Sequence, residues 1–175
     1  MISLVKQLIT QAAASADIPA DLVEAIPVKD NPVLYPPPRL YIEIADESLT
    51  RRDGLYAILQ TERPAGRIHR YRIYDRNLLV RVTIKERSDA QLETAVKAVL
   101  LALPKDTADE HNNLVRIKAE RAVRIGYDAR MVEVFDRYSA VLHITFSGVI
   151  TRDVEVTMIT DVTINPAFKQ DKKGD

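Results

Sequence analysis

The chain has 175 residues, contains no cysteine, and carries 25 basic and 25 acidic side chains. The length suits one domain, and a domain of this size buries enough surface to fold without disulfides or structural zinc. The lack of cysteine excludes disulfides, thiolate metal ligands and cysteine nucleophiles, and the balanced charge gives the whole chain no general attraction to nucleic acid or anionic membranes.

Residues 1–18 predict an amphipathic helix that ends before Pro19. Lys6 and Gln7 interrupt the apolar run and no basic residue precedes it, which argues against a signal peptide. No apolar stretch approaches the length of a membrane span. We therefore expect a soluble protein made without export. The apolar residues of the helix follow a helical stripe: Leu4, Val5, Leu8, Ile9 and Ala12.

Residues 19–38 are rich in proline and end in three consecutive prolines, which predicts an extended connector and argues against a central strand. Residues 39–46 then alternate, with Leu40, Ile42 and Ile44 in the apolar phase and Tyr41 in the polar phase. Residues 48–76 carry aromatic and β-branched residues around a Pro-Ala-Gly break at 64–66, which predicts a long hairpin. Residues 78–87 predict a further strand.

A helix over about 88–104 is the best-specified element of the chain. Ser88 and Gln91 form a capping box, Asp89 and Glu93 lie near the positive end of the helix dipole, and Pro104 limits continuation. Its apolar residues fall on one face: Leu92, Ala95, Val96, Val99, Leu100 and Leu103.

The rest of the chain predicts strands separated by polar segments. Residues 105–113 form a polar loop, and a break at 126–128 divides two alternating stretches. The first stretch places Val115, Ile117, Ala119, Val123 and Ile125 in one phase. The second, from residue 138, places Ala140, Leu142, Ile144, Phe146 and Ile150 in phase, and a last alternating piece covers 154–164.

These elements predict an α+β fold with a mainly antiparallel, twisted sheet of about four to five core strands plus the long hairpin. One face of the sheet would be covered by the N-terminal helix and the helix at 88–104, because most strands alternate. We expect one domain over 1–164, with the core sheet and helix at 39–153. Residues 154–164 would form an extra strand or arm, and 165–175 a polar tail.

The sequence carries no pattern that predicts an active site, a cofactor or a metal. The glycines are too dispersed for a phosphate-binding loop, and the three histidines lack metal-ligand spacing. Neighbouring acids at 46–47 and 109–110 lie at the ends of regular elements, where they favour turns. We therefore expect a protein that is not an enzyme.

One basic cluster stands out, because residues 62–87 contain eight basic and three acidic side chains. Tyrosines are interleaved, as on some nucleic-acid-binding surfaces. Three readings stay open: a solvated hairpin face, a docking face for an acidic protein partner, or a nucleic-acid contact. The candidate interface residues are Arg63, Arg67, Arg70, Tyr71, Arg72, Tyr74 and Arg76.

From about Leu40 to Asp153 the chain resembles the tail terminator (tail completion) proteins of long-tailed bacteriophages. The similar parts are the strand LYIEI, the strand-to-helix passage VRVTIKERSDAQLETAVKAVLLALP, and the stretch VRIGYDARMVEVFDRYSAVLHITFSGV with its Gly-Tyr-Asp turn. The likeness lies in the order of the elements and in local residue patterns. The chain departs from the simplest family pattern in its proline-rich connector at 27–38 and in its extra segment after Arg152.

The resemblance implies a structural virion protein that forms a six-membered ring on the tail tube, stops tube growth and joins the tail to the head connector. The implied partners are further copies of the chain, the tail tube protein, the head–tail connector and, in contractile tails, the sheath. Genomic DNA would at most pass through the ring. The implied location is the virion tail, assembled in the host cytoplasm, with the hairpin at about 55–74 facing the tube.

Two alternatives remain at this stage. Another head–tail joining or baseplate component would share the structural role. A small ferredoxin-like enzyme or nucleic-acid-binding module would instead use the basic, tyrosine-bearing face of the sheet and bind in a salt-dependent way.

Overall fold

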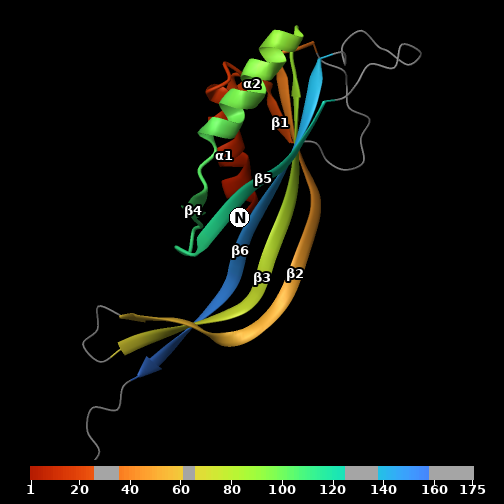
Figure 1. Ribbon diagram of the computed structural model, residues 1–175. Helices are drawn as coiled ribbons and strands as arrows, with labels where there is room; N and C mark the ends of the chain where they lie inside the picture. Colours follow the sequence, from red (N-terminus) through yellow and green to blue (C-terminus); the bar gives the residue numbers. More distant parts are fainter. Residues whose placement is uncertain (26–35, 61–65, 125–137, 158–175) are drawn as a thin grey trace, which may run out of the picture.

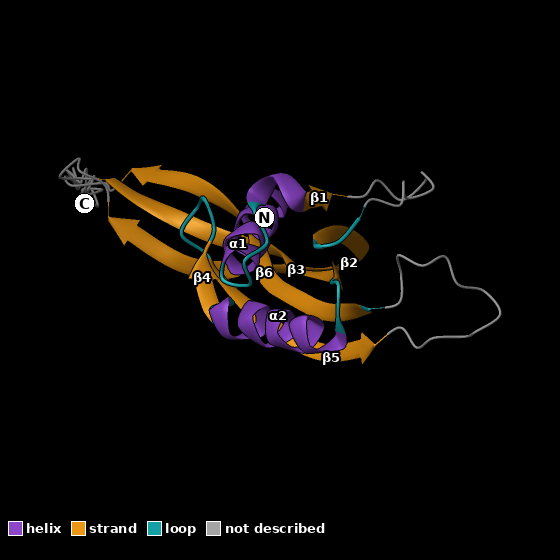
Figure 2. Cartoon of the chain, turned by 90° about the horizontal axis from the view of Figure 1, so that it is seen from above, coloured by secondary structure: helices purple, strands orange, loops and turns teal. Residues whose placement is uncertain are grey.

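The computed structural model describes residues 1–25, 36–60, 66–124 and 138–157 (Figure 1). Their six strands form one mixed, mostly antiparallel sheet in the order β1-β2-β3-β6-β5-β4. The two helices cover one face of that sheet (Figure 2). This confirms the predicted α+β class. The elements are α1 (Ile2–Ala14), a 3-10 turn (Ala20–Leu22), β1 (Val23–Ala25), β2 (Arg39–Gln60), β3 (Gly66–Lys85), α2 (Asp89–Ala102), β4 (Asp106–Ala108), β5 (Leu114–Arg124) and β6 (Ser139–Thr157).

Three very long strands dominate the sheet. β2 and β3 pair antiparallel from Arg39↔Lys85 to Gln60↔Arg67, and β6 follows β3 along its whole length. The two strands predicted at 39–46 and 78–87 and the hairpin predicted between them are therefore parts of one continuous strand pair. The extra strand predicted from residue 154 begins as a continuation of β6, and residues 158–164 lie outside the described residues.

Two short strands were missed by the sequence patterns. β1 lies in the segment predicted to be a plain connector and pairs parallel with β2, at Val23↔Leu40 through Ala25↔Ile42. β4 lies in the segment predicted to be a loop and pairs with β5. Each has only three residues, so neither shows a recognisable period, and each forms because a neighbouring strand offers an open edge. The sheet is consequently mixed and has six described strands.

The core lies between the helices and the adjoining half of the sheet. Ser88 caps α2 as predicted, since its Oγ accepts a hydrogen bond from the Gln91 N–H at 3.3 Å. α1 ends at Ala14, earlier than predicted, and is followed by a turn in which Asp17 has a φ of 57°. The fully buried large side chains are Val5, Ile9, Ile18, Leu40, Leu78, Val80, Val82, Ile84, Leu92, Leu142, Ile144 and Phe146.

The predicted phase of β5 is wrong beyond Ala119. A β-bulge between Ala119 and Arg121 shifts the register, so Ala122 pairs with Leu142 and Val123 turns to the opposite face. The same shift points Arg124 toward α2, where it meets Asp89 at 2.8 Å. The pattern of apolar and polar residues in β5 does not reveal where a bulge of one residue lies.

The alternation predicted that the sheet face opposite the helices is polar, but this face also contains a buried aromatic residue. Tyr41, predicted in the polar phase of its strand, is only 4% exposed, and Lys85 lies 5.5 Å from the centre of its ring. Within the described ranges, no helix has the length and apolar character needed to cross a membrane.

Beyond the helices, β2, β3 and β6 continue together as a three-stranded arm (Figure 1). We use this name for residues 49–60, 66–76 and 148–157. The pairing of β5 with β6 ends at Arg116↔Ser147, so β5 does not accompany β6 into the arm. The arm is therefore a piece of sheet without a helical layer in the described part of the chain.

Candidate interaction surface

The two faces of the arm follow from strand register, because paired residues share a face and successive residues alternate. Along β6, the phase of buried Phe146 continues through Gly148 and Ile150 to Val154. Strand pairing then shows which residues of β2 and β3 lie on the same side, through the rows Leu55↔Tyr71↔Arg152 and Ile58↔His69↔Val154. We call this side the apolar arm face; its residues are Leu49, Arg51, Leu55, Ile58, Arg67, His69, Tyr71, Tyr74, Arg76, Gly148, Ile150, Arg152, Val154 and Val156.

The apolar arm face exposes large hydrophobic side chains side by side. This arrangement arises because the phase that is buried under α1 and α2 runs on past the helices. Contiguous exposed apolar side chains in three adjacent strands are typical of interaction surfaces, whereas single ones are ordinary. The exposed fractions are 53% for Leu55, 51% for Leu49 and Ile58, and 37% for Ile150 and Val154.

Three register shifts shape the arm. β2 has irregularities between Arg51 and Gly54 and between Leu55 and Ala57, and β3 has one between Arg72 and Tyr74. Bulges increase local twist and bend a strand, so they turn the arm away from the plane of the main sheet. They also interrupt the outer edge of β2 and reduce its ability to pair with a foreign strand.

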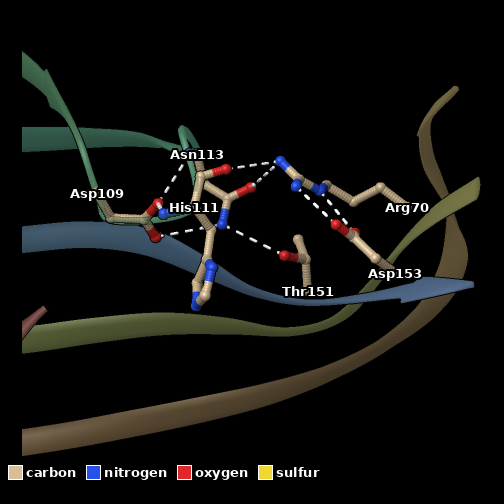
Figure 3. Close-up of polar contacts among 6 residues, drawn as sticks. All are labelled: Arg70, Asp109, His111, Asn113, Thr151 and Asp153. Carbon is tan, nitrogen blue, oxygen red and sulfur yellow. Dashed lines mark hydrogen bonds and ion pairs between the residues drawn. The ribbon is translucent and has the colours of Figure 1, made fainter. Parts of the chain in front are cut away.

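The opposite face of the arm is fastened to the loop between β4 and β5 by one arginine (Figure 3). The Arg70 guanidinium donates from Nε and Nη2 to the two carboxylate oxygens of Asp153, both at 2.7 Å. Its Nη1 donates to the His111 carbonyl at 2.7 Å. The Arg70 side chain is only 13% exposed but the Asp153 side chain is 40% exposed, so only the arginine of this pair is shielded from solvent.

A second set of bonds holds the loop itself. The Asp109 carboxylate accepts hydrogen bonds from the backbone N–H groups of His111 at 2.9 Å and Asn113 at 2.8 Å. The Asn113 amide donates to Asp109 at 3.2 Å and to the Thr151 hydroxyl on β6 at 3.3 Å. We call the six residues of Figure 3 the Arg70 clasp: Arg70, Asp109, His111, Asn113, Thr151 and Asp153.

The electrostatics of the clasp favour its charged form. The hydrogen bonds from Arg70 lower the pKa of Asp153, outweighing partial burial, and the Asp153 carboxylate raises the pKa of Arg70. Burial tends to raise the pKa of Asp109, but the hydrogen bonds from Asn113 and His111 outweigh it, so that pKa is lowered. The clasp is thus an ionised network at neutral pH.

The structure divides the predicted interface residues into two groups. Arg70, Arg72 and Arg76 have acidic partners within the chain: Asp153, Asp75 and, at 2.7 Å, Glu47. Arg67, Tyr71 and Tyr74 lie on the apolar arm face, where Arg67 is exposed and the tyrosines are half-buried. Arg63 lies outside the described residues.

The acids that offset the basic segment could not be assigned from the sequence. Glu47 comes from β2 and Asp153 from β6, so neither belongs to the segment 62–87 in which the charge was counted. Sequence reasoning also missed Leu49, Leu55, Ile58 and Arg152 as surface residues. The sequence did not show that Leu49, Leu55 and Ile58 share a face, because two register shifts of β2 lie between them, and the pattern of apolar residues does not reveal where the covering helices stop.

The three histidines lie on different parts of the structure. His69 lies on the arm, His111 in the β4–β5 loop, and His143 on β6 beside Arg81 and Arg121. Among the described residues, no group of three or more histidines and acids is placed to hold a metal ion.

Two hollows flank α2. One, of about 410 Å³, lies between the end of α1 and the start of α2 and is lined in part by Asp17, Pro38 and Glu86. The other, of about 590 Å³, lies between α2 and β5, and we call it the α2–β5 groove. Its apolar lining residues are Val96, Leu100, Leu101, Ala122 and Ala140, and its charged ones are Glu93, Lys97 and Arg124.

Comparison with known proteins gives little beyond these observations. No family model matches the chain, and no curated protein does. A chain of a solved structure titled "Virion of native gene transfer agent (GTA) particle" matches with 17% identity and a TM-score of 0.35. The match covers 81% of this chain and 84% of that chain. A likeness of this size carries no argument about function.

Proposed function

We propose that this chain is a structural protein of a phage-like virion that forms a ring on the end of the tail tube. In this role it stops tube growth and presents a surface to the head connector, without enzymatic activity or cofactor. Residues 1–164 would act as one domain and 165–175 as a polar tail. The partners would be further copies of the chain, the tube protein, the connector and, in a contractile tail, the sheath.

The observation that carries the proposal is the arm. A helix-covered core that extends three strands beyond its helices, with an exposed apolar face, suits a protein whose task is to contact other subunits. The order of a leading helix, a long hairpin, a long helix and two further strands also agrees with the resemblance to tail terminators.

The role of the arginines needs to be restated. Arg70, Arg72 and Arg76 already contact carboxylates of the same chain, and the contacts of Arg70 and Arg76 link β3 to its two neighbouring strands. The residues that remain for a partner are Arg67 and Arg152, which are exposed and have no acidic partner among the described residues.

The nucleic-acid alternative is weakened by the same geometry. A phosphate-binding surface needs several free cations, and stacking of bases needs accessible aromatic rings. In the described chain three of the clustered arginines are paired with acids, and Tyr71 and Tyr74 are half-buried. The alternative of another head–tail joining or baseplate component shares the arm-based reasoning and differs only in its partner.

The test is a capping assay. Tube protein from the same virus is polymerised with and without the purified chain, and tube lengths are measured by negative-stain electron microscopy. We expect shorter tubes, each with a ring at one end, at amounts of the chain far below those of the tube protein. Unchanged tube growth, together with salt-dependent binding of single-stranded oligonucleotides, would contradict the proposal and favour the nucleic-acid module.

A further inference from the structure

We infer that the sheet face opposite the helices binds the phosphate backbone of double-stranded DNA. The contact is made by five side chains of β3, β5 and β6, which we call the basic sheet face: Arg81, Arg116, Lys118, Arg121 and His143. The inference goes beyond the proposed function, in which DNA at most passes through the ring. It rests on strand register and charge and does not depend on that function.

Strand register places these side chains on one face of the sheet. Arg81, His143 and Arg121 lie opposite one another in a single cross-strand row of β3, β6 and β5. The next residues along β3 and β6, Val82 and Leu142, are buried under the helices. Because successive strand residues alternate, the row of His143 faces away from α1 and α2 (Figure 2).

Two further cations extend this row along β5. Lys118 pairs with Thr145 and Arg116 with Ser147, and Phe146, which lies between those two β6 residues, is buried on the helix side. Residues two apart on a strand are separated by about 6.6 Å, and neighbouring strands by about 4.8 Å. The positive side chains therefore spread over the sheet in two directions.

Most of this charge is free to meet a ligand. Arg116 and Arg121 are exposed and have no acidic partner among the described residues. Arg81 and Lys118 each lie near one carboxylate of the chain, at 3.4 and 3.6 Å. Exposed ion pairs of this kind contribute little to stability, so phosphate oxygens can replace those carboxylates at small cost.

The acidic residues of this face lie mainly on β2. Glu43 and Asp46 are both there, and β3 and β6 separate them from β5. Glu120 lies at the bulge of β5, close to Lys118. The β5 side of the face is therefore net positive, although the whole chain has no net charge.

A hollow of about 320 Å³ adjoins the basic sheet face where the arm begins. Arg116 lines it together with Arg72 and Asn77. Asp75, the acid of this hollow, is shared by Arg72 and by Arg52, which donates to it at 3.1 Å. The hollow thus adds amide and guanidinium donors, the groups that commonly contact DNA phosphates.

The composition of the face favours a nucleic acid over a protein partner. In the described chain, none of the exposed large hydrophobic side chains belongs to the basic sheet face. Protein interfaces have an apolar core, whereas protein–DNA interfaces are more polar and much more positively charged. The five residues include no Phe, Tyr or Trp on which unpaired bases could stack, so duplex phosphates fit better than a single strand.

The test is binding of a fluorescent DNA duplex of arbitrary sequence, followed by anisotropy over a series of salt concentrations. The variant combines Arg116→Gln with Arg121→Gln, and the matched control combines Lys6→Gln with Lys105→Gln. Both remove two positive charges at exposed positions, but Lys6 and Lys105 lie outside the basic sheet face. Circular dichroism verifies that all chains are folded.

We expect wild type to bind the duplex, with an affinity that falls as salt is added, because phosphate contacts release counterions. The Arg116→Gln, Arg121→Gln variant should bind roughly tenfold more weakly, with a log–log salt slope shallower by about 2. The control should keep the slope of wild type, because its lysines make no phosphate contact.

Three results would overturn the inference: no duplex binding by wild type even at low salt, equal losses in variant and control, or binding of polyglutamate as tight as that of DNA. The last result would identify a docking face for an acidic protein. The failure of the proposed function is distinct. A chain that caps tubes but does not bind duplex keeps the tail role and loses this inference, whereas one that binds duplex through this face but never caps tubes does the reverse.

Discussion

Arg70 on β3 donates two parallel hydrogen bonds of 2.7 Å to the carboxylate of Asp153 on β6. The same guanidinium donates a third hydrogen bond to the His111 carbonyl in the β4–β5 loop. This arginine thus joins two strands of the arm whose residues lie 83 apart in sequence, and it also ties the arm to the β4–β5 loop, 41 residues away. Charge-assisted, two-point contacts of this kind fix geometry as well as contributing energy. Arg70, which the sequence predicted to meet a partner, thus contacts Asp153 and His111 of its own chain.

Replacement of Arg70 by methionine should therefore loosen the arm while leaving the core folded. We expect a loss of about 1 kcal/mol in the free energy of unfolding, since the pair is only partly shielded from solvent. The measurement is urea unfolding, combined with hydrogen exchange of the arm amides. Arg67→Met is the control, and it should change stability by less than about 0.5 kcal/mol. Equal effects of the two substitutions would contradict a special role for Arg70.

The clasp should also weaken in acid. The folded-state pKa of Asp153 lies below its unfolded value, so the folded state binds fewer protons and stability rises with pH in that range. The contribution is complete above the usual aspartate pKa of about 4 and is lost as the pH falls through the lowered value. Asp109 changes in the same direction, because its pKa is also lowered.

Hydrogen exchange of residues 67–72, followed from neutral pH into acid, measures this effect. We expect arm amides to lose protection before core amides, and the Arg70→Met variant to show no such pH-dependent difference. The neighbouring ionisable groups are Arg70, Asp109 and His111, and an Asp109→Asn variant separates the contribution of the loop from that of the arm. Loss of protection at the same pH in arm and core would count against the clasp.

Ser88 gives a test of the helix start. Its Oγ accepts the Gln91 N–H, and its hydroxyl donates to the Gln91 side chain at 3.1 Å. Ser88→Ala should lower the free energy of unfolding by about 1 kcal/mol, as is typical for loss of an N-cap. Thermal unfolding measures the change, and Ser88→Asp should retain most of the stability. A neutral Ser88→Ala variant would mean that packing alone fixes the start of α2.

For Glu86 we expect stability to change with pH in the opposite direction to that expected for Asp153 and Asp109. It is only 8% exposed, and burial raises its pKa despite the N–H and charge of Arg87. Because folding disfavours the ionised form, stability should fall as the pH rises from the unfolded pKa through the raised folded value. Glu86→Gln should then be more stable than wild type at neutral pH, by less than about 1 kcal/mol, and equal to it near pH 4. Stability curves at the two pH values decide the matter, and a destabilised variant would show that the carboxylate is needed.

Some features of the fold were predictable because they depend on neighbours in sequence. The cap at Ser88, the apolar face of α2 and the phases of Val80, Val82 and Ile84 follow from local hydrogen bonding and side-chain periodicity. The α+β class and the position of the helices on one sheet face follow from the same patterns. Each of these features is confirmed by the structure.

Other features depend on contacts between distant segments. β1 and β4 form only because β2 and β5 offer them open edges, and the bulge after Ala119 is set by pairing with β6. The basic cluster illustrates the same limit, since Glu47 and Asp153 neutralise two of its arginines from other strands. Charge counted along a segment cannot include partners that only folding brings near.

The apolar arm face shows most clearly which property of a strand residue can be predicted from the sequence and which depends on tertiary structure. By itself, the sequence indicated which residues share a face within a stretch of strand that has no bulge, because alternation is a property of the backbone. It could not determine that Ile144 would be buried and Ile150 exposed, although both belong to one phase of β6. That difference arises only where α1 and α2 end and the three strands continue, so burial was settled by the length of the helices relative to the sheet.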